Sequence, residues 1–242
     1  MRRPITRFLR AATDLILPRS CVHCGHCCNH RDYEFLCKKC ASEIFFVQNP
    51  CCTTCGYPYI GAFVDPKRCP HCAPLDPLFD QGRILLLAQG TGRSLLHELK
   101  YRRGFYILRD IAKMVLNSSE YTNYIKGARL IPVPLHPVKF RERGFNQSQK
   151  LAAMLAKTCQ AEVVYLLRRT QNTKSQTRLN RHSREQNVKN AFAIATNARV
   201  IPNDDYILID DVFTTGSTLN ACAQVLRQAG AKSIRVATVG HG

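Results

Sequence analysis

The sequence predicts an α/β protein in which a mostly parallel sheet is flanked by helices and follows a cysteine-rich N-terminal module. Strand-like apolar runs alternate with helical stretches from about residue 81 onward, which is typical of a parallel sheet. Eleven of the 13 cysteines lie between Cys21 and Cys72. The turn-forming stretch 73–77 separates the cysteine-rich part of the chain from the part with alternating strands and helices. We therefore expect one unit at 1–80 and a second at 81–242.

The N-terminal stretch is expected to form an amphipathic helix that ends near Pro18. Arg7, Arg10 and Asp14 interrupt any apolar run, so a signal peptide is not predicted, and no run in the chain approaches the roughly 20 apolar residues of a transmembrane helix. We expect this helix to pack on the protein, with a basic membrane-surface helix as the alternative. Without an export signal, the expected location is the cytoplasm.

The N-terminal module contains four CxxC pairs, and such pairs are a strong signal for structural zinc. Two intervening residues let a tight turn direct both thiolates at one tetrahedral ion. An iron–sulfur cluster and free structural thiols are the alternatives. We prefer sequential use of the pairs, in which the first two pairs bind one ion and the last two bind the other. In the alternative, an interleaved cross-brace, the first and third pairs would share one ion and the second and fourth the other. Four thiolates close the site in either arrangement and leave no open position for water. The predicted ligands of two structural zinc ions are Cys21, Cys24, Cys37, Cys40, Cys52, Cys55, Cys69 and Cys72.

Other soft ligands stand close to these pairs. For each, a role outside the metal sites is the better interpretation, although any of them could substitute for a predicted ligand. They are Cys27, Cys28, Cys51, His23, His26, His30 and His71.

The second unit is read from its apolar periodicity. Strands are expected at 84–88, 130–134, 163–167, 206–209 and 233–239, with a proline-bounded loop after the second of these. Helices are expected from Thr91 through Leu99, and at 105–117, 147–158 and 217–229. Residues 168–190 are polar and basic, and we expect a mobile excursion there.

The segment 206–219 carries the clearest chemical signal. An apolar strand is followed by Asp210 and Asp211, then by the small-residue loop TTGST that opens a helix. Loop amides and a helix N-terminus can bind a phosphate, and Gly216 allows the backbone to approach it closely. The two carboxylates suit ribose hydroxyls or a hydrated magnesium ion. An ordinary N-cap beside acidic turn residues is the alternative, and it leaves the paired carboxylates unexplained.

This segment resembles the phosphoribosyl pyrophosphate (PRPP) signature of type I phosphoribosyltransferases. Further motifs are Leu99-Lys100-Tyr101, Val133-Pro134-Leu135 and 141–147, and together with the cysteine pairs they make the chain similar to the ComF family, also called ComFC or GntX. The resemblance implies a double zinc ribbon followed by a type I phosphoribosyltransferase-like domain. It also implies PRPP with magnesium as ligand, held by Asp210, Asp211, Thr214, Thr215, Gly216, Ser217 and Thr218.

The family is linked to natural competence, the import of single-stranded DNA into the bacterial cytoplasm. The charge distribution agrees with a phosphate-rich partner, since residues 81–200 hold 22 Lys/Arg against 6 Asp/Glu, a net +16. Candidate contacts to pyrophosphate or nucleic acid are Lys100, Arg102, Lys139, Arg141 and Arg143. For each of these side chains, a solvated basic face is an equally good interpretation.

Two functions from different classes remain open. The first is a competence protein that binds PRPP and single-stranded DNA, with other DNA-uptake proteins at the inner membrane as possible partners. The second is a genuine phosphoribosyltransferase of nucleotide metabolism. No pocket for an accepting base or amine is visible in the sequence. No C-terminal hood is expected after the last strand, and the zinc module could take the place of the hood.

Overall fold

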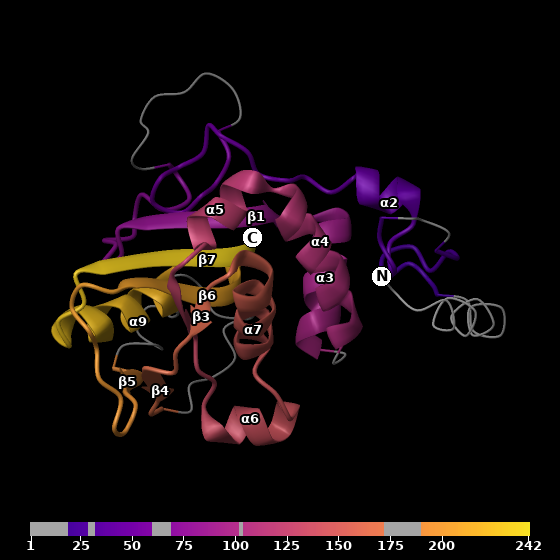
Figure 1. Cartoon of the computed structure of the whole chain (residues 1–242). Coiled ribbons are helices and arrows are strands. Elements are labelled where there is room, and N and C mark those ends of the chain that lie inside the picture. Colours follow the sequence, from indigo (N-terminus) through magenta and orange to yellow (C-terminus); the bar gives the residue numbers. More distant parts are fainter. Residues whose placement is uncertain (1–18, 29–31, 60–68, 102–103, 172–189) are drawn as a thin grey trace.

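The computed structural model describes residues 19–28, 32–59, 69–101, 104–171 and 190–242 (Figure 1). The predicted helix at 1–18, most of the predicted excursion (172–189) and Arg102 lie outside the described residues. No helix of the described part is long and apolar enough to cross a membrane.

A five-stranded parallel sheet forms the centre of the molecule, in the order β1-β7-β6-β2-β3. Side chains alternate between its faces, so that Tyr206 and Leu208 pack on one side while Ile207 and Ile209 pack on the other. The strands are β1 (Gln81–Leu87), β2 (Arg129–Pro132), β3 (Glu162–Val163), β6 (Asp205–Phe213) and β7 (Ser233–His241). The expected parallel α/β sheet is therefore confirmed.

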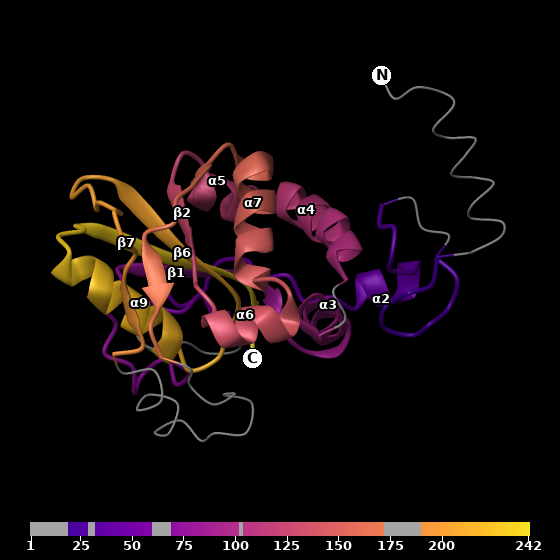
Figure 2. The same cartoon turned by 90° about the horizontal axis from the view of Figure 1, so that it is seen from below.

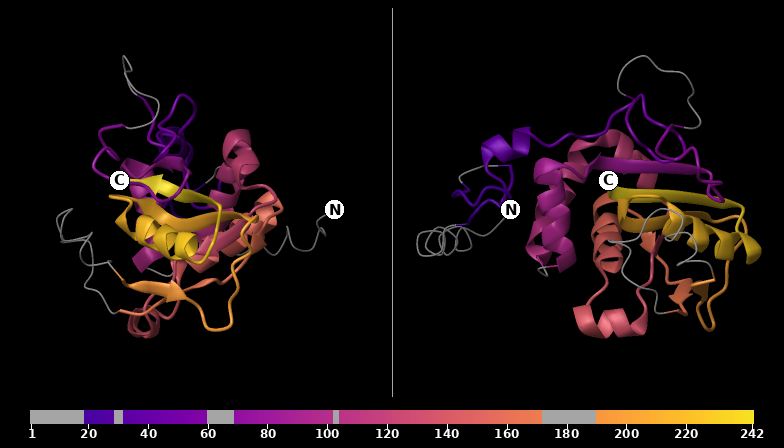
Figure 3. Two further views of the ribbon diagram at one scale, coloured as in Figure 1. Left: turned by 90° about the vertical axis from the view of Figure 1, so that its left-hand side faces the viewer. Right: turned by 180° about the vertical axis from the view of Figure 1, so that it is seen from behind.

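Helices cover both faces of the sheet (Figures 1 and 3). One face carries α3 (Gly90–Tyr101), α4 (Leu108–Asn117), α5 (Ser119–Ile125) and α7 (Gln147–Cys159). The opposite face carries α9 (Ser217–Gln228), whose Leu219, Cys222 and Leu226 are buried against it. The 3₁₀ turn η1 (Phe105–Ile107) leads into α4, so the predicted helix at 105–117 begins as a tighter turn.

The order of the strands creates a crevice between β2 and β6. From β2 the chain passes through α7 to β3 on one side, whereas from β6 it passes through α9 to β7 on the other. Helices α7 and α9 consequently begin at the same edge of the sheet. Strand β2 ends at Pro132, opposite Ile209, while β6 continues to Phe213. Ligands bind at such switch points in open α/β sheets.

Three segments differ from the sequence-based expectation. A short helix, α6 (Pro137–Arg143), replaces the expected proline-bounded loop, because Pro137 occupies its first turn and the His136 imidazole accepts the Val138 N–H. The predicted strand 163–167 is divided: β3 ends at Val163, and β4 (Leu167–Arg169) pairs instead with β5 (Phe192–Ile194). Strand β6 extends through both aspartates, because the β7 ladder continues opposite them to His241.

The cysteine-rich module lies in two places. The first pairs of cysteines, with helix α2 (Lys38–Ser42), lie beside α3 and α4, whereas the later pairs lie over β1 (Figures 1 and 2). The intervening segment 45–47 runs antiparallel along the edge of β1, where Val47 N–H donates to the Leu85 carbonyl and Leu87 N–H to that of Phe45.

Candidate functional site

The eight predicted metal ligands form two separate clusters of four thiols. Within each cluster the sulfur atoms lie within 4.8 Å of one another. Measured Sγ–Sγ distances include 3.6 Å for Cys52 and Cys72 and 3.4 Å for Cys55 and Cys69. A tetrahedral zinc with Zn–S bonds of about 2.3 Å requires sulfurs about 3.8 Å apart, so the clusters fit two structural zinc sites. The preferred sequential pairing is confirmed, and an interleaved cross-brace is not formed.

The additional cysteines do not join these clusters. Cys27 is exposed, Cys28 is half-buried, and the Cys51 thiol donates to the side chain of Asn49 at 3.4 Å. Burial and the nearby Cys21 raise the pKa of Cys28 to about 12, which disfavours its thiolate form. The four-thiolate sets therefore need no substitute ligand from these residues.

The phosphate loop, residues 214–218, connects β6 to α9 at the crevice. Gly216 has φ of 76°, which a glycine adopts without strain, and caps α9. A methyl group at this position would lie 2.6 Å from Phe213 Cζ and 2.8 Å from Leu75 Cδ2. The Thr215 and Ser217 hydroxyls are 2.8 Å apart and form a hydrogen bond with each other. The helix N-terminus lines one hollow together with Thr214, Ser217 and Thr218, whereas Thr215 is not among the residues that line it.

The two aspartates lie at the floor of the crevice, on β6. Ser148, on the first turn of α7, donates its hydroxyl to Asp210 Oδ1 at 2.8 Å, and the Asp211 N–H donates to the same oxygen at 2.9 Å. Burial, followed by the charge of Asp211, raises the pKa of Asp210 to about 7. The Asp211 carboxylate is 3.6 Å from Lys100 Nζ, and this contact raises the lysine pKa.

One oxygen of the aspartate pair is held by an ion pair rather than by a hydrogen bond. Asp211 Oδ2 is buried and lies 3.6 Å from Lys100 Nζ, and it accepts no hydrogen bond from the residues that the structure describes. If Lys100 turned to another partner, this buried oxygen would lose its counter-charge, which is costly, and a divalent cation could take that place. The paired carboxylates therefore fit magnesium.

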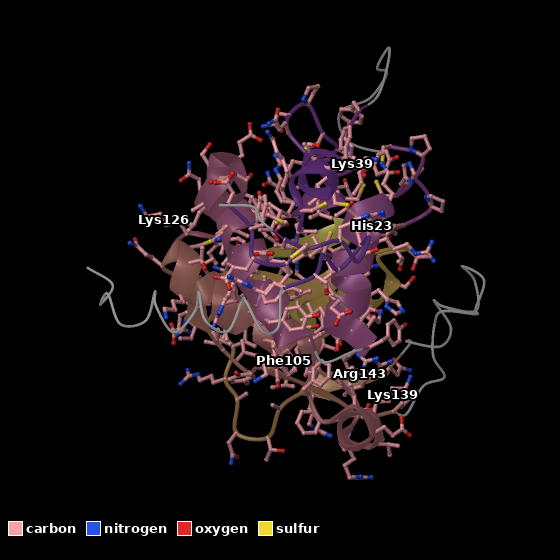
Figure 4. The ribbon with its side chains drawn as sticks, turned by 90° about the vertical axis from the view of Figure 1, so that its right-hand side faces the viewer. His23, Lys39, Phe105, Lys126, Lys139 and Arg143 are labelled. Atoms are coloured by element: carbon pink, nitrogen blue, oxygen red, sulfur yellow. The ribbon has the colours of Figure 1, made fainter. Side chains whose placement is uncertain are left out.

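A wall of positive charge stands opposite the aspartates. Lys100, Lys139, Arg143 and Arg169 line a second hollow, which shares Asp210, Asp211 and Thr218 with the phosphate-loop hollow. Lys139 and Arg143 lie close together on α6 (Figure 4). Burial and the charges of Arg169 and Arg143 lower the pKa of Lys139. Like charges held at such proximity favour binding of an anion between them.

The structure brings most of the predicted site residues together. Lys100, Lys139 and Arg143 join the aspartates and the phosphate loop, whereas Arg141 is exposed on α6 and is not among the side chains that line either hollow. Arg169 was missed as a site residue, because its position depends on β4 folding back to the crevice. Only its positive charge could have suggested a role.

Comparison with known proteins agrees with this arrangement. The phosphoribosyl transferase domain model matches residues 142–240, and the double zinc ribbon domain model matches residues 12–73. A hypoxanthine phosphoribosyltransferase from Staphylococcus aureus aligns over 55% of this chain and 62% of its own chain, at 15% identity and a TM-score of 0.33.

Three curated relatives match different shares of the chain. Competence protein F of Haemophilus influenzae is 28% identical over 84% of this chain and 96% of its own length. DNA utilization protein YhgH of Escherichia coli is 30% identical over 76% of this chain and 81% of its own length. Competence protein ComFC of Streptococcus pneumoniae is 28% identical over 54% of this chain and 56% of its own length.

The fold and the cysteine clusters define a protein class in which a double zinc ribbon precedes a phosphoribosyltransferase-type domain. Similarity to Competence protein F and YhgH covers most of this chain and of those proteins. The chain belongs to the ComF family.

Proposed function

We propose that this protein binds PRPP with magnesium at the crevice between β2 and β6, and that it binds single-stranded DNA and supports DNA uptake in the cytoplasm. The observation that carries the PRPP part is the convergence of three features at one switch point. These are the phosphate loop, the aspartate pair, and the cationic wall.

Each feature matches one part of PRPP. The phosphate loop would hold the 5′-phosphate with its backbone N–H groups and hydroxyls. Asp210 and Asp211 would accept hydrogen bonds from ribose hydroxyls, and magnesium would neutralise phosphate charge beside them. Lys100 would exchange its contact with Asp211 for one with pyrophosphate, together with Lys139, Arg143 and Arg169.

The PRPP part is tested by titration calorimetry with and without magnesium. Asp211→Asn keeps the size of the side chain but removes the charge that faces Lys100, so we expect magnesium-dependent affinity to fall. Thr215→Val should weaken binding through loss of a hydroxyl donor. Asp205→Asn, a change on the same strand at its far end beside Arg235, is the matched control and should leave affinity unchanged. Equal affinity in Asp211→Asn and the wild type would refute the assigned role.

The DNA part is supported by the names of the relatives and by the basic charge of residues 81–200. Neutralised phosphates release counterions, so log affinity for an oligonucleotide should fall with log salt by roughly 0.7 per phosphate contacted. Lys139→Gln with Arg143→Gln should reduce both affinity and this slope. Lys38→Gln with Lys39→Gln, on the exposed surface of α2, removes the same charge elsewhere and is the control.

A transferase activity is the second candidate, favoured by the cationic wall beside the aspartates. Four cations could stabilise pyrophosphate as it leaves the ribose. Incubation with PRPP, magnesium and nucleobases, followed by a pyrophosphate assay, tests it directly. In a naturally transformable host, loss of transformation without a purine or pyrimidine requirement supports the DNA-uptake role, whereas auxotrophy with normal transformation supports the transferase.

A further inference from the structure

The C-terminal residue of α3 places an exposed aromatic ring at the mouth of the crevice. Tyr101 lines the hollow beside Lys100, and 52% of it is exposed to solvent. His97 lies one helical turn earlier, and its ring centroid is 4.8 Å from that of Tyr101. The Tyr101 ring is thus supported by His97 of the same helix, while much of its surface remains exposed to solvent.

Two cations of the proposed pyrophosphate site also face this ring. Lys100 Nζ and Arg143 Cζ are each 5.9 Å from the Tyr101 centroid. Van der Waals contact occurs at about 3.5–4.0 Å, so neither cation is packed against the ring. A planar group between the tyrosine and the guanidinium needs two such contacts, or roughly 7 Å, which a displacement of Arg143 by about one ångström provides.

We infer that Tyr101 is a stacking platform for a nucleobase, which would lie between its ring and the Arg143 guanidinium. This inference rests on the proposed function and extends it from the ribose and phosphates to the base. Bases stack on aromatic rings with little dependence on sequence, and a guanidinium plane adds a cation–π contact on the other side. The base could belong to a free nucleobase beside PRPP or to a nucleotide within a single strand.

Two other aromatic rings of the described structure lack this setting. Phe140 is 44% exposed on α6 but is not among the side chains that line the hollow. Phe105, although it lies below Lys150 Nζ at 5.3 Å, is packed edge-on against Phe145. Tyr101 combines exposure, a position on the hollow and two facing cations, and therefore it alone of these three rings is assigned to base stacking.

The chain contains no tryptophan, so a single introduced indole reports on its own surroundings. Tyr101→Trp should show fluorescence quenching when a base stacks on it, and Phe140→Trp is the exposed control that should respond much less. The probes are oligo(dT), oligo(dA) and abasic oligonucleotides, and free adenine and uracil with PRPP and magnesium. Quenching by base-containing strands identifies the strand as the source, and quenching by a free base with PRPP identifies an acceptor.

Affinity measurements on Tyr101→Ala separate stacking from a structural role. We expect about 5- to 100-fold weaker binding of the responding base-containing probe, recovery in Tyr101→Phe, and unchanged PRPP affinity. Equal quenching in the two tryptophan variants, or unchanged base affinity in Tyr101→Ala, would overturn the inference. Absence of PRPP binding in the wild type would instead defeat the proposed function, while quenching by strands would still test the platform.

Discussion

The two zinc ribbons share one cysteine pattern but stand in different relations to the phosphoribosyltransferase-type sheet. All four sulfurs of the second cluster belong to buried residues, whereas Cys24 of the first is exposed and Cys37 is half-buried. The first ribbon is held against α3 and α4, where buried Asp110 accepts the N–H groups of Glu34 and Phe35 at 2.7 and 2.8 Å.

The second ribbon contacts β1, and the linker that follows the ribbon contacts the phosphate loop and α9. The Gly82 N–H of β1 donates to the Thr53 carbonyl at 2.9 Å, and Leu75, which follows the last ligand, packs on Gly216. The Asn220 side chain on α9 accepts the Leu78 N–H and donates to the Asp76 carbonyl. The two ribbons therefore stand in different relations to the proposed PRPP site: the first contacts α3 and α4, whereas the linker that follows the second contacts the phosphate loop and α9.

The largest expected effect comes from removing one ligand from each ribbon in turn. Cys55→Ser and Cys24→Ser should each lower zinc content from about two ions per chain to about one, since three thiolates bind zinc more weakly than four. Only Cys55→Ser should also weaken PRPP, by roughly 10- to 100-fold, because the loop would shift by about an ångström. Elemental analysis and calorimetry measure both, and equal PRPP affinities would remove the distinction between the ribbons.

A pair of leucines sharpens the comparison without touching metal. Leu75 and Leu36 are 5% and 0% exposed, in the linker after the second ribbon and in the first ribbon. Each change to alanine should cost about 2–5 kcal/mol of unfolding free energy, because each leaves a cavity. PRPP affinity should fall several-fold in Leu75→Ala alone. If Leu36→Ala weakened PRPP equally, general destabilisation would explain the effect.

A pH titration separates the contribution of Asp210, on β6, to PRPP binding from that of Leu75, in the linker after the second ribbon. The pKa of Asp210 is raised to about 7 from an ordinary value near 4, so its protonated form favours the folded state, and that stability is lost as pH rises through 7. Magnesium-dependent PRPP binding needs the charged form and should therefore strengthen from pH 6 to pH 8. Asp210→Asn should abolish this strengthening of PRPP binding with pH. Leu75→Ala should weaken binding at every pH but leave its strengthening between pH 6 and pH 8 intact.

The sequence predicted the elements whose signals are local. CxxC spacing located both metal clusters, and the apolar run before Asp210 located β6, since each pattern lies within a few residues. It could not locate Arg169 in the site, because β4 reaches the crevice through its pairing with β5 across 22 intervening residues. Nor could it separate the ribbons, since the contact of Leu75 with Gly216 joins residues far apart in the chain.

The smallest expected effect concerns the aromatic contact between the second ribbon and the sheet. His241, at the end of β7, is 3% exposed, and its ring stacks on that of Phe213 at 5.2 Å and meets Tyr57 of the ribbon edge-on at 4.9 Å. Neither ring nitrogen has a hydrogen-bond partner among the described residues. His241→Phe keeps a planar ring and removes both unsatisfied nitrogens, so unfolding free energy should change by less than about 1 kcal/mol.

His241→Ala removes the ring itself and should lower stability by about 2–4 kcal/mol, as loss of a large buried side chain does. Zinc content should stay at about two ions per chain in both variants, since His241 is not a ligand. Denaturant unfolding followed by circular dichroism measures the difference. If His241→Phe proved as damaging as His241→Ala, a polar role for the imidazole would be required, and this contact would depend on more than packing of aromatic rings.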